Sequence, residues 1–218
     1  MIFANWRGTY MQVAIVLYPG FTSLDVIGPY EVLGRLPDTE VVFVAEKPGL
    51  VVNDLKSLSI DVVATLADVT TPDIVLVGGG PGQMEQMSND ALLDWLRTTD
   101  KTSRWTTAVC SGSFLLAAAG LLNGRRATTH WAALDQLAEF GAIPSKQRVV
   151  VDGHYATAAG VSAGIDMALT LGGLIAGDDV AQTVQLVIEY APEPPYSAGS
   201  LDSAPADVVE SARRVLSG

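Results

Sequence analysis

The sequence contains a single cysteine, Cys110, and only two histidines among 218 residues. One cysteine cannot form a disulfide within the chain, so a disulfide-stapled fold is excluded. Neither His130 nor His154 pairs with a cysteine or an acidic residue at metal-ligand spacing. The sequence therefore predicts no metal site, and it holds no motif for an organic cofactor.

Long apolar runs and an excess of basic residues are also lacking. No run of about 20 apolar residues is free of charge, and residues 1–10 do not form a signal peptide, so we expect a cytoplasmic protein without a membrane partner. Thirteen Lys and Arg stand against 24 Asp and Glu, a net charge of −11. Such a surface repels phosphate backbones, which disfavours nucleic acid as a partner.

Hydrophobic residues make up 49% of the chain and charged residues 17%, which is typical of a compact, well-buried protein. The length suits one medium-sized core. We expect a single domain over residues 11–218, preceded by an extension over residues 1–10, with Met11 as the natural start.

Short β-branched runs alternate with helical patterns along most of the sequence, which predicts a doubly wound α/β layer sandwich with a mainly parallel sheet. Asp152-Gly153 between two β-rich runs predicts an added hairpin over 149–158. The expected strands are 12–18, 40–46, 73–79 and 104–110, and the expected helices are 23–36, 89–100, 111–122, 130–140, 161–177 and 178–190. Three prolines keep 191–205 out of a helix, before a final amphipathic stretch.

Three loops follow parallel strands and should meet at one edge of the sheet, where the sites of such folds form. They carry Asp25, the glycine turn 78–83, and Cys110 with Ser111. Cys110 stands where a strand breaks into a helix, a corner that favours a thiolate. Local pattern leaves a catalytic nucleophile and a small buried core residue equally open for Cys110.

Asp25 lies among apolar residues, as a first-turn capping residue or as a functional acid. If it lies beside Cys110, the two groups would share a proton. The glycine turn lacks the spacing of a phosphate-binding loop, so we expect the N–H groups of Gly79, Gly80 and Ser111 to form an oxyanion hole. His130 could approach Cys110, but a structural hydrogen bond at a helix start is favoured, and His154 should face solvent.

The chain resembles the DJ-1/PfpI superfamily and, within it, the isocyanide (isonitrile) hydratases. The resemblance covers about residues 11–210, and five segments carry it together: "LDVIGPYEVL", "GGGPG", "AVCSGSFLLAAAGLLNGRRATTHW", "DGHYATAAGVSAGIDMALTL" and "QLVIEYAPEPPYSAGSLDSAPADVV". It implies a flavodoxin-like three-layer αβα sandwich with a nucleophile elbow, and a homodimer. Cys110 would be the nucleophile and Asp25 the acid, and Ser111 replaces the His of the peptidase branch.

The implied reaction is the cysteine-dependent hydration of a small apolar isocyanide, R–N≡C, to an N-substituted formamide through a thioimidate, without a cofactor. Four residues depart from the hydratase pattern and bear on the substrate more than on the fold: Gly78, Pro81, Ala158 and Ala159.

Two other functions remain open. The chain also resembles the ligand-sensing domain of AraC-type regulators, whose basic DNA-binding half this acidic sequence does not contain. A glyoxalase, chaperone-like or redox-responsive role, known in other branches of the superfamily, is disfavoured by aspartate in place of their glutamate.

Overall fold

A computed structural model describes residues 10–217 of the chain. These residues form two compact units, 10–188 and 189–217, and each is described by itself. The extension expected at residues 1–10 lies outside the described residues except for the exposed Tyr10. The single domain expected over residues 11–218 stays a prediction.

A seven-stranded sheet forms the centre of the first unit, with the order β10-β11-β7-β6-β1-β2-β5. Every neighbouring pair is parallel except the hairpin β10–β11. The strands are β1 Met11–Val16, β2 Thr39–Ala45, β5 Ala64–Thr65, β6 Ile74–Val77, β7 Trp105–Val109, β10 Val149–Asp152 and β11 Tyr155–Ala158. The four predicted parallel strands and the predicted hairpin are confirmed.

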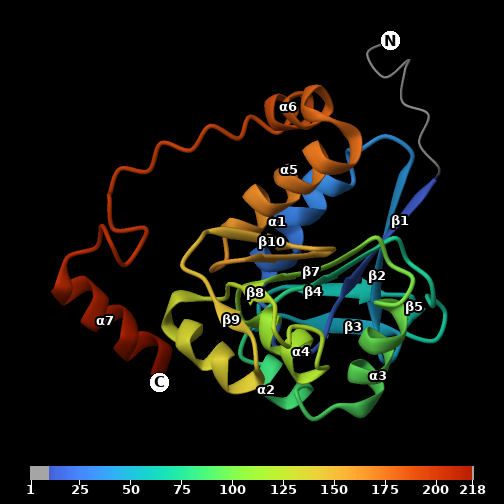
Figure 1. Cartoon of the computed structure of the whole chain (residues 1–218), viewed down its shortest axis with the longest axis horizontal. Helices are drawn as coiled ribbons and strands as arrows, with labels where there is room; N and C mark the ends of the chain where they lie inside the picture. The colour runs from blue at the N-terminus through green and yellow to red at the C-terminus, as the bar shows by residue number, and fades with distance from the viewer. Residues whose placement is uncertain (1–9, 218) are drawn as a thin grey trace. The chain divides into compact units, whose positions relative to one another are not determined.

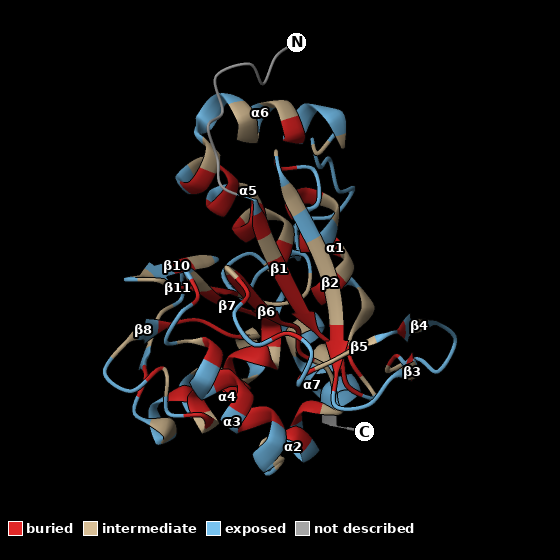
Figure 2. Cartoon of the chain, turned by 90° about the vertical axis from the view of Figure 1, so that its right-hand side faces the viewer, coloured by how far each residue is buried: buried red, intermediate tan, exposed pale blue. Residues whose placement is uncertain are grey.

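Helices cover both faces of this sheet, as the predicted three-layer sandwich requires (Figure 1). One face carries α1 Ser23–Leu33 and α5 Ala163–Ala176, with α6 Asp178–Val187 against α5. The other carries α2 Gln83–Gln86, α3 Asp90–Thr99 and α4 Ser113–Ala118 (Figure 2). None of the helices within residues 10–217 is long and apolar enough to cross a membrane.

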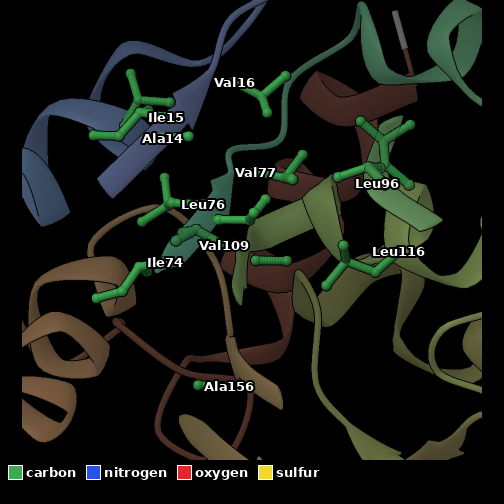
Figure 3. Close-up of a cluster of buried hydrophobic side chains, with 14 of the residues drawn as sticks. Ala14, Ile15, Val16, Ile74, Leu76, Val77, Leu96, Val109, Leu116 and Ala156 are labelled. Atoms are coloured by element: carbon green, nitrogen blue, oxygen red, sulfur yellow. The ribbon is translucent and has the colours of Figure 1, made fainter. Parts of the chain in front are cut away.

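The core lies between the sheet and these helices. Ile15, Leu76 and Val109 have no solvent exposure, which explains why their strands are almost wholly apolar (Figure 3). Leu96 of α3 and Leu116 of α4 are equally buried. Each fully buried side chain of this size contributes about 1.5–3 kcal/mol to the free energy of folding, so this layer holds the strand ends in place.

Two predicted helices differ from the structure. The helix expected over 111–122 becomes a short 3-10 turn, η1 Cys110–Gly112, followed by α4, which ends well before Leu122. Gly120 has φ +81, a left-handed conformation that cannot continue a helix. The segment expected over 130–140 is a 3-10 helix, η2 Trp131–Phe140, which ends at left-handed Gly141.

Small elements that the sequence pattern does not predict decorate the first unit. They are the antiparallel hairpin of β3 Gly49–Val52 and β4 Ser59–Val62, and the pair β8 Arg126–Ala127 and β9 Ile143–Pro144. In the second unit, residues 191–205 contain no helix, as their prolines predict, and α7 Ala206–Ser217 follows.

A partly buried carboxylate links the β10–β11 hairpin to the rest of the sheet. Asp100, just after α3, accepts a hydrogen bond from Tyr155 Oη at 2.9 Å and one from Thr106 Oγ1 at 2.7 Å. His154 Nε2 lies 3.0 Å from the same carboxylate, and its side chain is 38% exposed, so it faces solvent in part, as expected, and also contacts Asp100. The side chains near the turn of the hairpin therefore converge on one anion.

Replacing Tyr155 by phenylalanine tests this anchor. Tyr155→Phe keeps the ring and removes the hydroxyl from Asp100, so the free energy of unfolding should fall by about 1–2 kcal/mol in a urea titration. Tyr196→Phe is the matched control, because that side chain is 82% exposed and should change stability little. Equal effects of the two substitutions would contradict the anchor.

Candidate active site

Cys110 occupies a strained corner between β7 and the helix α4. Its φ is +57, in the left-handed region that a residue with a Cβ adopts at a cost of roughly 1–2 kcal/mol. The backbone is held on both sides: Cys110 N–H donates to Ala159 O at 3.0 Å, and the Thr129 hydroxyl donates to Cys110 O at 2.7 Å. The predicted nucleophile elbow is thus confirmed as geometry.

Gly112 makes the tight corner possible. A Cβ at this position would lie 2.3 Å from Val77 O, closer than any real Cβ contact. Only glycine lets the turn after Cys110 pass this close to the end of β6, as the sequence predicts.

The Cys110 sulfur is almost completely buried, with 7% of the residue exposed. Burial first, and the negative charge of Asp25 second, raise the pKa of the thiol to about 12. Backbone N–H groups of Val161 and Ser111 donate to the sulfur and lower its pKa, but they do not outweigh burial. Burial thus opposes the thiolate that the strand-to-helix corner is expected to favour, because desolvation of the charged form outweighs the two N–H groups.

Asp25, in the first turn of α1, has no solvent exposure. Burial raises its pKa to about 7, even though hydrogen bonds from the Gly79 N–H and the Cys110 thiol lower it. Oδ2 accepts the Gly79 N–H at 2.8 Å, whereas Oδ1 has no hydrogen-bond partner among the described residues. The carboxyl is therefore poised to exchange a proton at neutral pH beside the thiol.

Asp25 is held away from the capping arrangement that its position in α1 would allow. In a capping box, Thr22 and Asp25 would bond to each other's backbone N–H groups through their side chains. Here Gly79 lies between them: Thr22 N–H donates to Gly79 O at 2.9 Å, and Gly79 N–H donates to Asp25. The structure therefore favours the functional acid over the first-turn cap.

The glycine turn lies close against the acid and the elbow. A Cβ on Gly79 would lie 2.5 Å from Ser111 Oγ, and one on Gly80 would lie 2.4 Å from Gly20 O. The Gly80 N–H donates to Ser111 Oγ at 3.0 Å. The N–H groups of Gly79, Gly80 and Ser111, expected to form an oxyanion hole, thus bind Asp25, Ser111 and the Cys110 sulfur in this structure.

His130 has the structural role that the sequence favours. Its Nδ1 accepts the Ala132 N–H at 3.3 Å at the start of η2, and its ring contacts Trp131. Burial lowers its pKa, so the ring is neutral at physiological pH. A Cβ on Gly160 would lie 2.7 Å from the ring, which places His130 against the segment that leads to Val161.

Several residues of the site carry no signal in the sequence. Val161, with φ +27, supplies an N–H to the sulfur, and buried Tyr18 donates its hydroxyl to Gly78 O at 2.6 Å. A Cβ on Gly78 would lie 2.7 Å from Val26, so the departure at this position suits the close packing of α1. These contacts depend on the conformation of the loops at this edge of the sheet, which the pattern of residue types does not predict.

Neither a metal site nor a second catalytic cluster accompanies this pair. No group of three or more His, Cys, Asp or Glu side chains in the part of the chain that the structure describes could hold a metal ion. A cavity of about 510 Å³ lies beyond the ends of β1 and β2, where Tyr18 and Glu46 line it, but neither Cys110 nor Asp25 does. This cavity is thus separate from the candidate reacting pair, Cys110 and Asp25.

Comparisons with known proteins agree with this geometry. The model of the DJ-1/PfpI family matches residues 11–172. The isonitrile hydratase of Pseudomonas putida is 46% identical over 204 residues, which cover 94% of this chain and 89% of that protein. The HTH-type transcriptional regulator CdhR of Pseudomonas aeruginosa is 32% identical over 72% of this chain, which spans 48% of the regulator.

Solved structures show the same fold. A ThiJ/PfpI family protein from Pseudomonas syringae superposes with a TM-score of 0.91 at 33% identity, covering 100% of this chain and 95% of that one. DJ-1beta of Drosophila melanogaster superposes with a TM-score of 0.76 at 23% identity, over 84% of this chain and 100% of that one, which supports the fold alone.

The charge of Asp25 should suppress the reactivity of Cys110. Asp25→Asn removes the negative charge that raises the thiol pKa, so alkylation by iodoacetamide at about pH 8.5 should accelerate by up to about tenfold. Mass spectrometry counts the label directly, because the chain has one cysteine. Asp94→Asn, an exposed substitution with the same change of charge, should leave the rate unchanged; an Asp25→Asn rate equal to that of wild type would contradict the pairing.

Asp25 should also make stability depend on pH. Its pKa rises from the ordinary 3.8 to about 7 on folding, so the folded chain keeps a proton that the unfolded chain loses. This contribution is fully present below pH 3.8 and is lost as the pH rises through 7. Asp25→Asn should therefore gain roughly 1–3 kcal/mol over wild type between pH 4 and pH 8 in urea titrations, and parallel pH curves would refute the raised pKa.

Proposed function

Since the chain belongs to the DJ-1/PfpI family, we propose that it is an isonitrile hydratase that converts R–N≡C to the N-substituted formamide R–NH–CHO. One observation carries the proposal: a buried carboxyl with a pKa of about 7 lies beside the only thiol of the chain. The 46% identity to the isonitrile hydratase of Pseudomonas putida over nearly the whole chain supports it.

The first step joins the thiol to the substrate. The terminal carbon of an isonitrile is electrophilic, so the Cys110 sulfur attacks it and forms a carbon–sulfur bond. Because the thiol pKa is about 12, the sulfur needs a base, and the Asp25 carboxylate takes its proton. Asp25 then delivers that proton to the same carbon, which gives the thioimidate R–N=CH–S–Cys110.

The second step consumes water. Asp25, again a carboxylate, takes a proton from the water whose oxygen attacks the thioimidate carbon, and passes that proton to the nitrogen. The resulting R–NH–CH(OH)–S–Cys110 breaks its carbon–sulfur bond, and the hydroxyl proton leaves for the sulfur. The formamide dissociates and the thiol is restored, so the reaction consumes only the isonitrile and water.

Preorganised bonds support this sequence of proton transfers. The Gly79 N–H fixes Oδ2 of Asp25, and the Cys110 thiol also donates to this carboxyl, which holds the two reacting groups next to each other. The Val161 and Ser111 N–H groups stabilise negative charge on the sulfur when it attacks and when it leaves. None of these contacts places a positively charged side chain next to Cys110 or Asp25, which favours a neutral substrate over an anionic one.

A stand-alone ligand-sensing domain is the second candidate, supported by 32% identity to the CdhR regulator. A sensor needs to bind its ligand without converting it. A measurement of substrate turnover therefore distinguishes the hydratase from the ligand-sensing domain.

Formamide production from cyclohexyl isocyanide and para-nitrophenyl isocyanide tests the proposal. Wild-type protein should release the formamide over many turnovers, detected by mass spectrometry. Cys110→Ala should abolish turnover, and Asp25→Asn should lower it by about 10²–10⁴, the usual contribution of a general acid or base. Both variants should keep the wild-type circular dichroism spectrum.

Thr102→Val is a suitable control, because this hydroxyl bonds only to the carbonyl of nearby Thr99, remote from Cys110 in the fold. It should turn over like wild type. Binding of either isocyanide by folded wild type without any formamide would favour the sensor, and full activity in Cys110→Ala would exclude the nucleophile.

A further inference from the structure

The turn of the β3–β4 hairpin lies against the segment that leads into α1. Phe21 and Asn53 form a parallel bridge, and Gly20 N–H donates to Val52 O at 2.9 Å. Asp54 N–H donates to Phe21 O at 2.9 Å. Backbone bonds thus bind the hairpin turn to the residues that come just before Asp25.

Asn53 makes this turn rigid. Its Oδ1 accepts the N–H groups of Ser57 and Leu58, both at 3.1 Å, and its Nδ2 donates to Ser23 Oγ at 3.0 Å. The side chain is 4% exposed, so these bonds are shielded from water. A turn closed in this way presents the next residue, Asp54, in one position.

The Asp54 carboxylate is directed at Thr22. Its Oδ2 accepts the Thr22 hydroxyl at 2.7 Å, and its Oδ1 accepts the Leu55 N–H at 2.8 Å. Both bonds use the oxygens as acceptors, which suits the ionised form. Within residues 10–217 no lysine, arginine or histidine forms an ion pair with Asp54, so no cation neutralises it directly.

Thr22 connects this charge to the acid of the site. Its N–H donates to Gly79 O, its carbonyl accepts the Asp25 N–H at 3.1 Å, and its hydroxyl donates to Asp54. Although Thr22 is the N-cap of α1, its side chain caps no backbone group. The hydroxyl is thus committed to the hairpin rather than to the helix.

We propose that Asp54 is a positioning residue for Asp25: its carboxylate holds the Thr22 hydroxyl at the start of α1 and places a negative charge on the hairpin side of the Asp25 carboxyl. This inference rests on the proposed function, in which Asp25 transfers a proton. It adds a residue from a hairpin that contributes nothing else to the site.

Electrostatics supports the assignment. Three titratable groups act on Asp25: the Cys110 thiol, the Tyr18 hydroxyl and the Asp54 carboxyl. The thiol and the phenol are neutral near pH 7, because burial raises the pKa of both. Burial is the largest cause that raises the pKa of Asp25, and the negative charge of the Asp54 carboxylate adds to it in the same direction.

Infrared difference spectroscopy of the full chain tests the inference without any turnover. The carbonyl band of protonated Asp25, identified by its loss in Asp25→Asn, is titrated between about pH 4 and pH 9. Asp54→Asn keeps the shape and an acceptor oxygen but removes the charge. The dissociation constant of Asp25 should then rise about threefold to tenfold, a midpoint lower by about 0.5–1 unit.

Two further variants separate the charge from the fold. Asp54→Glu keeps the charge and should hold the midpoint near that of wild type. Asp68→Asn removes a charge from a turn in which Asp68 likewise accepts a threonine hydroxyl, from Thr65, so it should leave the midpoint unchanged. If Asp54→Asn titrates like Asp68→Asn, or if Asp54→Glu shifts as far as Asp54→Asn, the inference is wrong.

These outcomes are independent of the proposed function. A lowered midpoint in a protein that makes no formamide would keep the role of Asp54 and reject the hydratase. Formamide production with an unmoved midpoint would do the opposite. Where turnover is observed, the pH dependence of kcat in Asp54→Asn should shift in the same direction as the infrared midpoint.

Discussion

The site depends on one peptide, that of Gly79. Its N–H fixes the Asp25 carboxyl, its carbonyl receives the Thr22 N–H, and its missing Cβ leaves room for Ser111. Through these contacts the end of β6 joins the start of α1 to the elbow after β7. A buried carboxyl would otherwise have to be hydrated or paired with a cation, and both would remove its proton at neutral pH.

The sequence predicts most of the fold and the two reacting groups. Apolar strands and alternating helices require a parallel sheet, and a parallel sheet brings the loops with Asp25, Gly79 and Cys110 to one edge. The partners of these groups are not predictable, because the bonds of Thr22 and Val161 follow from loop conformation. The pKa of the Cys110 thiol is not predictable for a related reason: residue types indicate the strand-to-helix corner, whereas they do not indicate how deeply the thiol is buried.

Two features of the candidate site at this edge of the sheet reduce the stability of the fold. Cys110 has a left-handed backbone, and Asp25 keeps one buried oxygen without a partner. The buried layers of the sheet on either side offset these costs, since Val77 and Val109, which end the strands beside the site, have no solvent exposure. A rigid core thus holds a locally unfavourable arrangement at the candidate site.

The crowding around Gly79, Gly80 and Gly112 also bears on how this protein can change over evolution. No side chain can be accommodated at these three positions unless the backbone moves. None of the three glycines can therefore be substituted while the site keeps its geometry. The other side of Cys110 is less restricted, because Ala159 and Val161 contact the cysteine through their backbone groups. Substitutions there would leave these two contacts in place, whereas a side chain at any of the three glycines would displace the backbone around the candidate site.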